Sequence, residues 1–308
     1  MTELALLPLA GASRIIYFGT PEIAVAPLEA LVASGCDVRL VVTRPDVRRG
    51  RGTKTTASPV KIAAQRLGIA VSHSPNDAIA LAQQDQNLLG VVVAYGELFK
   101  SDLLSAVPMV NVHFSLLPRW RGAAPVERAI LAGDTKTGVC IMRVVEKLDE
   151  GEVFARDEVQ IDEMDDADSL RLKLNAVAIK LLLFTVKNGC RDGVEQSGEV
   201  VYAKKITTND LQINWQTPAI QVIRQVRIGG AFATINRKRL KIVRAKVSSI
   251  QTPGKLPGQI CGLTNVSCVV ATTDGAVSLI EVQPEGKAIM KVEEWMNGAR
   301  LSEQSRFE

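Results

Sequence analysis

An unbroken apolar run at residues 90–96, Gly-Val-Val-Val-Ala-Tyr-Gly, places the strictest limit on the fold of this 308-residue chain. Such a run is typical of a β-strand that is buried on both faces, because no polar position alternates with the apolar ones. Strands of that kind occur in parallel sheets that carry helices on both faces. The run therefore predicts the central strand of an α/β domain.

Strand and helix patterns alternate around this run as far as about residue 190. Apolar runs predict further strands at 14–18, 38–43, 110–115 and 138–144. The alternation predicts a mostly parallel, doubly wound, Rossmann-like domain over residues 13–190. The first turn, Gly19-Thr20-Pro21, lacks the later glycines of a dinucleotide fingerprint, so a nicotinamide or flavin cofactor has little support.

The pattern changes after Gly189. Residues 191–210 are expected to form a linker, and residues 211–308 a small domain with one helix at about 219–226. Short β runs separated by Gly and Pro turns follow, at 240–243, 268–272 and 277–282. These runs predict a small C-terminal β-barrel of the OB-like kind.

The basic residues are concentrated in one stretch. Residues 203–260 hold eleven Lys and Arg and one acid, although the formal net charge of the whole chain is only +4. A long basic block without compensating acids indicates a polyanionic partner, and we expect nucleic acid.

Several function classes have little support. No apolar run is long enough to cross a membrane, and the first ten residues hold an acid and no base, unlike a secretory signal. The five cysteines lack metal-ligand spacing, so we expect reduced thiols, no metal site and a cytoplasmic protein. Residues up to about Ala12 are expected to form a loose extension.

Candidate site residues follow the central strand. Asn111 and His113 lie two apart on the next predicted strand, so they share a face, and Pro118 prevents the strand from continuing. An amide and an imidazole at a strand end, beside an irregular loop, are typical of a site in an open α/β sheet. His73, the other histidine, is expected to be an exposed loop residue.

These residues carry a resemblance. Asn-x-His at 111–113, Ser-Leu-Leu-Pro at 115–118 and Leu-Asp-Glu-Gly at 148–151 resemble the signature of the folate-dependent formyltransferases. Phe114 stands where the commoner family residue is Gly. The continuation at 119–125, Arg-Trp-Arg-Gly-Ala-Ala-Pro, is similar to members of the family that act on initiator methionyl-tRNA.

The resemblance implies a donor and a set of roles. The donor would be 10-formyltetrahydrofolate, and the acceptor would be the amine of methionine on initiator tRNA. Asn111 and His113 would donate hydrogen bonds to the developing oxyanion, and Asp149 would orient the imidazole and relay protons. The tetrahydrofolate-binding segment would be Ser115, Leu116, Leu117 and Pro118, although core packing of the two leucines is the alternative.

A long basic loop over residues 44–57 is the second implied contact. It holds Arg48, Arg49 and Arg51 among glycines, with Asp46 as the one acid. In related tRNA formyltransferases the equivalent loop reaches the acceptor end of the tRNA. We expect a monomer. The alternatives are formyl transfer to a sugar nucleotide or another small amine, folate hydrolysis, or RNA binding without catalysis.

Overall fold

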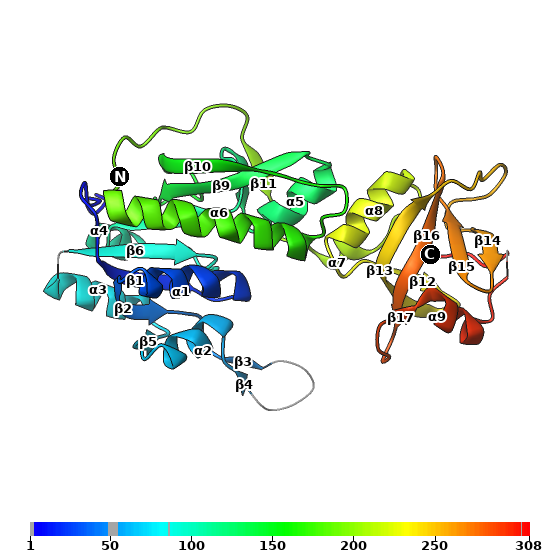
Figure 1. The fold of residues 1–308 in the computed structure, drawn as a ribbon, viewed down its shortest axis with the longest axis horizontal. Coiled ribbons are helices and arrows are strands. Elements are labelled where there is room, and N and C mark those ends of the chain that lie inside the picture. The colour runs from blue at the N-terminus through cyan, green and yellow to red at the C-terminus, as the bar shows by residue number, and fades with distance from the viewer. Residues whose placement is uncertain (1–2, 49–54, 86, 303) are drawn as a thin grey trace. The chain divides into compact units, whose positions relative to one another are not determined.

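The computed structural model describes residues 3–48, 55–85, 87–302 and 304–308. The chain forms two compact units. The first comprises Met1–Val126, Thr135–Ile161 and Leu170–Lys204, and the second comprises Glu127–Asp134, Asp162–Ser169 and Lys205–Glu308. Most of the first unit is blue to green in Figure 1, and most of the second is yellow to red.

A seven-stranded sheet forms the centre of the first unit (Figure 1), in the order β10-β9-β7-β6-β1-β2-β5. Its parallel strands are β1 (Arg14–Gly19), β2 (Asp37–Val42), β5 (Val71–Ser72), β6 (Leu88–Val93) and β7 (Met109–His113). β9 (Lys136–Arg143) and β10 (Val153–Gln160) are antiparallel to their neighbours. All six residues of β6 are buried, so the prediction of a central α/β strand is confirmed.

Helices cover both faces of this sheet. Ile16 and Phe18 of β1 point to one face, where they pack with α3 (Pro75–Gln84) and α4 (Ser101–Ala106). Ile15 and Tyr17 point the other way, because successive strand residues alternate. There the Tyr17 hydroxyl donates to the Ala24 carbonyl at 2.6 Å, just before α1 (Val25–Ala33). The remaining helices of this unit are α2 (Pro59–Arg66) and most of α6 (Ala167–Asn188). Most of α5 (Pro125–Ala132) belongs to the second unit.

The N-terminal extension is held against the first unit, so the prediction of a loose segment is wrong for the described residues. The Ala5 amide donates to the Leu104 carbonyl at 3.0 Å, and the Ala12 amide donates to the Val186 carbonyl at 2.8 Å. These backbone bonds join the extension to α4 and α6. The extension has no secondary-structure period of its own, so no sequence pattern indicated this attachment.

The segment expected as a linker also contains ordered structure. β11 (Val201–Ala203) pairs in parallel with β8 (Arg119–Gly122), which follows directly on the predicted site strand. The Ala123 amide donates to the Ala203 carbonyl at 2.9 Å. The chain therefore returns to the candidate site before it leaves the first unit.

The second unit is built on an antiparallel sheet in the order β12-β13-β16-β15-β14, with β17 on β16. Its strands are β12 (Phe232–Ile235), β13 (Lys238–Ser248), β14 (Ile260–Thr264), β15 (Ser267–Ala271), β16 (Ala276–Pro284) and β17 (Met290–Lys291). Its helices are α7 (Thr208–Leu211), α8 (Ala219–Arg227) and α9 (Val292–Ala299). Trp215 and Phe307 meet in its core with ring centroids 5.5 Å apart. The predicted C-terminal β domain is therefore confirmed.

Asp210 joins two parts of the second unit. Its carboxylate accepts from both Arg128 guanidinium ends at 2.7 and 3.1 Å and from the Thr207 amide at 2.8 Å. The Arg128 hydrogen bond is the main cause that lowers the pKa of Asp210 to about 2, from an ordinary value of 3.8. The ionised carboxylate therefore stabilises the fold above about pH 4, and this contribution disappears as the pH falls toward 2.

We expect Asp210→Asn to lower the free energy of unfolding by roughly 1 to 2 kcal/mol at pH 7, after allowance for solvent screening. Urea unfolding of wild type and variant between pH 7 and pH 3 measures this difference. It should stay constant above about pH 4.5 and shrink below it. Asp37→Asn, at an exposed carboxylate, is the matched control. A difference that is absent at pH 7, or independent of pH, would contradict the assignment.

Candidate active site

A cavity of about 480 Å³ lies in the first unit, where β6 and β7 end and the segment after β9 begins. Ligands of open α/β sheets bind at the carboxyl ends of the strands, and the volume lies in the range of small-molecule sites. The polar residues that line it include Asn111, His113 and Asp149, and the apolar ones include Tyr95, Phe99 and Phe114.

The three predicted catalytic residues meet at this cavity. Asp149 Oδ1 accepts from Asn111 Nδ2 at 3.4 Å, and Asp149 Oδ2 lies 3.6 Å from His113 Nδ1. The His113 and Asp149 side chains are only 6% and 11% exposed, so little water screens the pair. Asn111 and His113 share a face of β7, as their spacing predicted.

The backbone around Asp149 determines where its carboxylate lies. Asp149 has φ of +53°, a left-handed conformation that few residues other than Gly adopt and that Asp tolerates. Its Oδ2 also accepts from the Gly122 amide at 2.8 Å, which lies at the end of β8. The carboxylate is therefore held from β8 while it faces two side chains of β7.

A backbone carbonyl assigns the proton of His113. His113 Nε2 lies 2.9 Å from the Trp120 carbonyl oxygen, and a carbonyl can only accept a hydrogen bond. The proton of the neutral ring is therefore on Nε2. Nδ1, on the side of Asp149, is left with a lone pair that can accept a proton.

An aromatic group forms the apolar side of the cavity. The rings of Tyr95 and Phe99 stack with centroids 5.5 Å apart, and Phe18 packs edge-on against both. Burial, with a smaller contribution from Glu97, raises the pKa of Tyr95 to about 12, so its hydroxyl stays protonated. Phe99 was missed in the sequence because it lies in an irregular segment, although the end of a central strand is itself a signal.

The predicted folate segment lies outside the described cavity lining. Ser115 donates its hydroxyl proton to the Arg119 carbonyl at 2.6 Å, and Leu117 packs with Cys140 and Met142. Leu116 approaches Gly138 of β9, and Pro118 is buried. A folate-binding role for these four residues stays a prediction.

The predicted tRNA-binding arginines fall on a loop that the structure describes only in part. Arg48 belongs to β3 (Val47–Arg48), which pairs with β4 (Thr55–Thr56), and Arg49 and Arg51 lie outside the described residues. Their role stays a prediction. His73 is exposed in a loop, as expected.

The described residues give no support to thiol chemistry or to a metal site, and no cysteine lines the cavity. Burial raises the pKa of the thiols of Cys140 and Cys190 to about 11 and that of Cys268 to about 12. Within the described part of the chain, no three His, Cys, Asp or Glu side chains are grouped as metal ligands. No helix there has both the length and the apolar character needed to span a membrane.

Comparison with known families supports the class that the fold and site indicate. Residues 13–186 match the model described as formyl transferase, and residues 205–300 match the one described as formyl transferase, C-terminal domain. Both parts of the chain, the Rossmann-like domain with its Asn-x-His strand and the β domain after it, therefore match formyltransferases, and the chain is a formyltransferase.

Relatives that match nearly the whole chain identify the family within the formyltransferases. The methionyl-tRNA formyltransferase of Symbiobacterium thermophilum is 40% identical over 96% of this chain and 95% of its own length. The enzyme of that name from Corynebacterium diphtheriae is also 40% identical, over 94% of this chain and 98% of its own. The chain belongs to the methionyl-tRNA formyltransferase family.

Solved structures share the fold at low identity. HypX from Aquifex aeolicus in complex with tetrahydrofolic acid has a TM-score of 0.65 at 14% identity; the match covers 94% of this chain and 47% of HypX. This chain therefore spans about half the length of HypX. An N-formyltransferase from Helicobacter canadensis, in complex with folinic acid and dTDP-3-aminofucose, has a TM-score of 0.62 at 16% identity; that match covers 89% of this chain and 99% of that one.

Proposed function

We propose that this chain transfers a formyl group from 10-formyltetrahydrofolate to the amino group of methionine on initiator methionyl-tRNA, for translation initiation in the cytoplasm. The observation that carries the proposal is the meeting of Asn111, His113 and Asp149 at one apolar cavity. The relatives that resemble this chain along their whole length carry the name of this reaction. Because all three side chains come from one chain, we propose that the monomer is active.

The cavity suits the donor. A stacked aromatic pair beside polar groups can hold a flat heterocycle, and the volume of about 480 Å³ accommodates one. Two structural neighbours were solved in complex with folates. When bound, the donor supplies the electrophilic formyl carbon. We propose that Tyr95 and Phe99 line the slot for its ring system.

The geometry supports a separate proposed role for each of the three polar side chains. His113 Nδ1 takes the proton that the attacking amine releases, because Nε2 is already bonded to the Trp120 carbonyl. Asp149, 3.6 Å from Nδ1, then stabilises the imidazolium. The same proton is then passed to the folate nitrogen as its bond to the formyl carbon breaks, so tetrahydrofolate leaves neutral. Asn111 Nδ2 has a second hydrogen besides the one directed at Asp149, and this hydrogen donates to the developing oxyanion.

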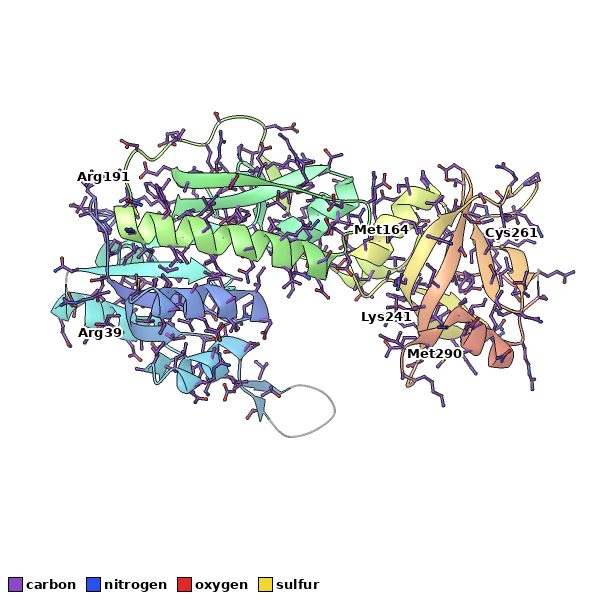
Figure 2. The ribbon with its side chains drawn as sticks, viewed as in Figure 1. Arg39, Met164, Arg191, Lys241, Cys261 and Met290 are labelled. Carbon is purple, nitrogen blue, oxygen red and sulfur yellow. The ribbon has the colours of Figure 1, made fainter. Side chains whose placement is uncertain are left out.

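The positive charge on the second unit favours tRNA over a small molecule as the acceptor. β13 carries exposed basic residues, including Lys238, Arg239 and Lys246, and Lys241 of the same strand is labelled in Figure 2. A long row of basic residues suits a nucleic-acid backbone, and such binding weakens steeply as the salt concentration rises. A small acceptor needs no such surface.

The proposal is tested with purified enzyme, 10-formyltetrahydrofolate and either charged initiator tRNA or dTDP-3-aminofucose. Mass spectrometry of the released amino acid or sugar measures formylation, and size-exclusion chromatography with light scattering measures the mass of the active species. We expect formylmethionine from the tRNA and no formylated sugar. Efficient formylation of the sugar with none of the tRNA would replace the proposed acceptor, and no transfer to either would reject the function.

The basic loop gives a separate prediction. We expect replacement of Arg48, Arg49 and Arg51 by Ala to lower kcat/KM for methionyl-tRNA by about tenfold to a hundredfold, because each guanidinium can pair with one phosphate. The salt dependence of tRNA binding should become shallower by roughly one unit of slope for each phosphate that is no longer paired. Tetrahydrofolate affinity, measured by fluorescence quenching, is the internal control. An unchanged kcat/KM for the tRNA would remove the loop from recognition.

A further inference from the structure

A buried arginine lies next to the turn that carries Asp149. Arg121 is 7% exposed, and its Nη1 lies 3.0 Å from Glu150 Oε1. The other side of the guanidinium donates to the side-chain oxygen of Gln196, from Nε at 3.0 Å and from Nη2 at 2.8 Å. A buried guanidinium is stable only when its donors and charge are matched, and here they meet one carboxylate and one amide.

The nitrogen of the same Gln196 amide holds the turn that carries Asp149. Its Nε2 donates to the Asp149 carbonyl and to the Gly151 carbonyl, both at 2.8 Å. The single amide thus connects the buried guanidinium to backbone atoms on both sides of Glu150. Gly151 is also confined, because a Cβ there would lie 2.0 Å from the Arg143 carbonyl oxygen.

Two neighbouring residues of β8 position Asp149, one through its main chain and the other through its carboxylate. Through Gln196, Arg121 acts on the Asp149 main chain, and the Gly122 amide donates directly to Asp149 Oδ2. The left-handed backbone of Asp149, with φ of +53°, needs such external support because an isolated turn would relax to a commoner conformation. A rotation here would move the carboxylate away from His113 Nδ1.

We propose that Gln196 and Arg121 are positioning residues, which hold the Asp149 turn so that its carboxylate faces His113 and Asn111. This inference rests on the proposed function, because it assigns Gln196 a role that acts through Asp149. Gln196 contributes no atom to the reaction. It belongs to the segment 191–210, which also contains β11 and was expected to serve only as a linker.

Two substitutions of Gln196 test the hydrogen bonds that it donates to the Asp149 turn. Gln196→Ala removes the whole bridge, whereas Gln196→Glu keeps an oxygen for Arg121 and loses both donors to the turn. We expect each to lower kcat by about tenfold to a hundredfold, the range for a misplaced catalytic group, with both KM values within about twofold. Gln160→Ala, at an exposed glutamine of β10, should keep the wild-type kcat.

The Asp149→Asn background separates positioning from general damage. Single-turnover rates with enzyme in excess should be nearly equal for Asp149→Asn and for its combination with Gln196→Ala, because the bridge acts only through that carboxylate. A wild-type kcat for Gln196→Glu, or an equal loss in the Asp149→Asn background, would overturn the positioning role. A wild-type rate for Asp149→Asn alone would instead reject the catalytic cluster of the proposed function.

Discussion

Replacement of His113 by Ala is expected to lower kcat for formyl transfer by at least about a hundredfold. The substitution removes the one ring nitrogen, Nδ1, that lies beside Asp149 with a lone pair available to take a proton. The attacking amine would then have to release its proton to water, in a site that is largely closed to water. Rapid-quench measurement of formylmethionyl-tRNA under saturating substrates determines kcat directly.

Binding provides the control for the His113 variant. The stacked rings of Tyr95 and Phe99 do not depend on His113, so tetrahydrofolate affinity should change by less than about threefold. His73→Ala, at the exposed histidine, should behave like wild type in both assays. A near-normal kcat for His113→Ala would exclude the imidazole from proton transfer.

The second large effect is expected for Asp149→Asn. Asn can still accept from the Gly122 amide, so the turn can keep its shape, but its neutral side chain no longer stabilises a positive imidazolium. We expect kcat to fall by about a hundredfold or more, as when the carboxylate partner of a catalytic histidine is neutralised. Thermal unfolding should change little, and Asp157→Asn on β10 is the matched surface control.

The double variant shows whether the two residues act together. Since the carboxylate works only through the imidazole, His113→Ala combined with Asp149→Asn should be hardly slower than the slower single variant. The measurement is again a single-turnover rate with enzyme in excess. Losses that multiply would show that Asp149 contributes to catalysis by a route that does not include His113.

The local sequence was sufficient to predict several elements of the site. The apolar run at 90–96 identified the buried strand β6, because burial on both faces excludes polar side chains. The two-residue period of a strand predicted that Asn111 and His113 share one face, and both line the cavity in the structure. The antiparallel β10 was missed because three charged residues, Arg156, Asp157 and Glu158, interrupt its apolar ones.

Only the tertiary structure brought Asp149 to His113. That meeting depends on the antiparallel pairing of β9 with β7 and on a left-handed turn, neither of which local spacing encodes. The same holds for the Trp120 carbonyl that assigns the His113 proton, and for Gln196, which lay in an expected linker. Periodicity determines which face of a strand a side chain occupies, whereas contacts between distant segments depend on how strands pair and loops close, and these are decided by the packing of the whole unit.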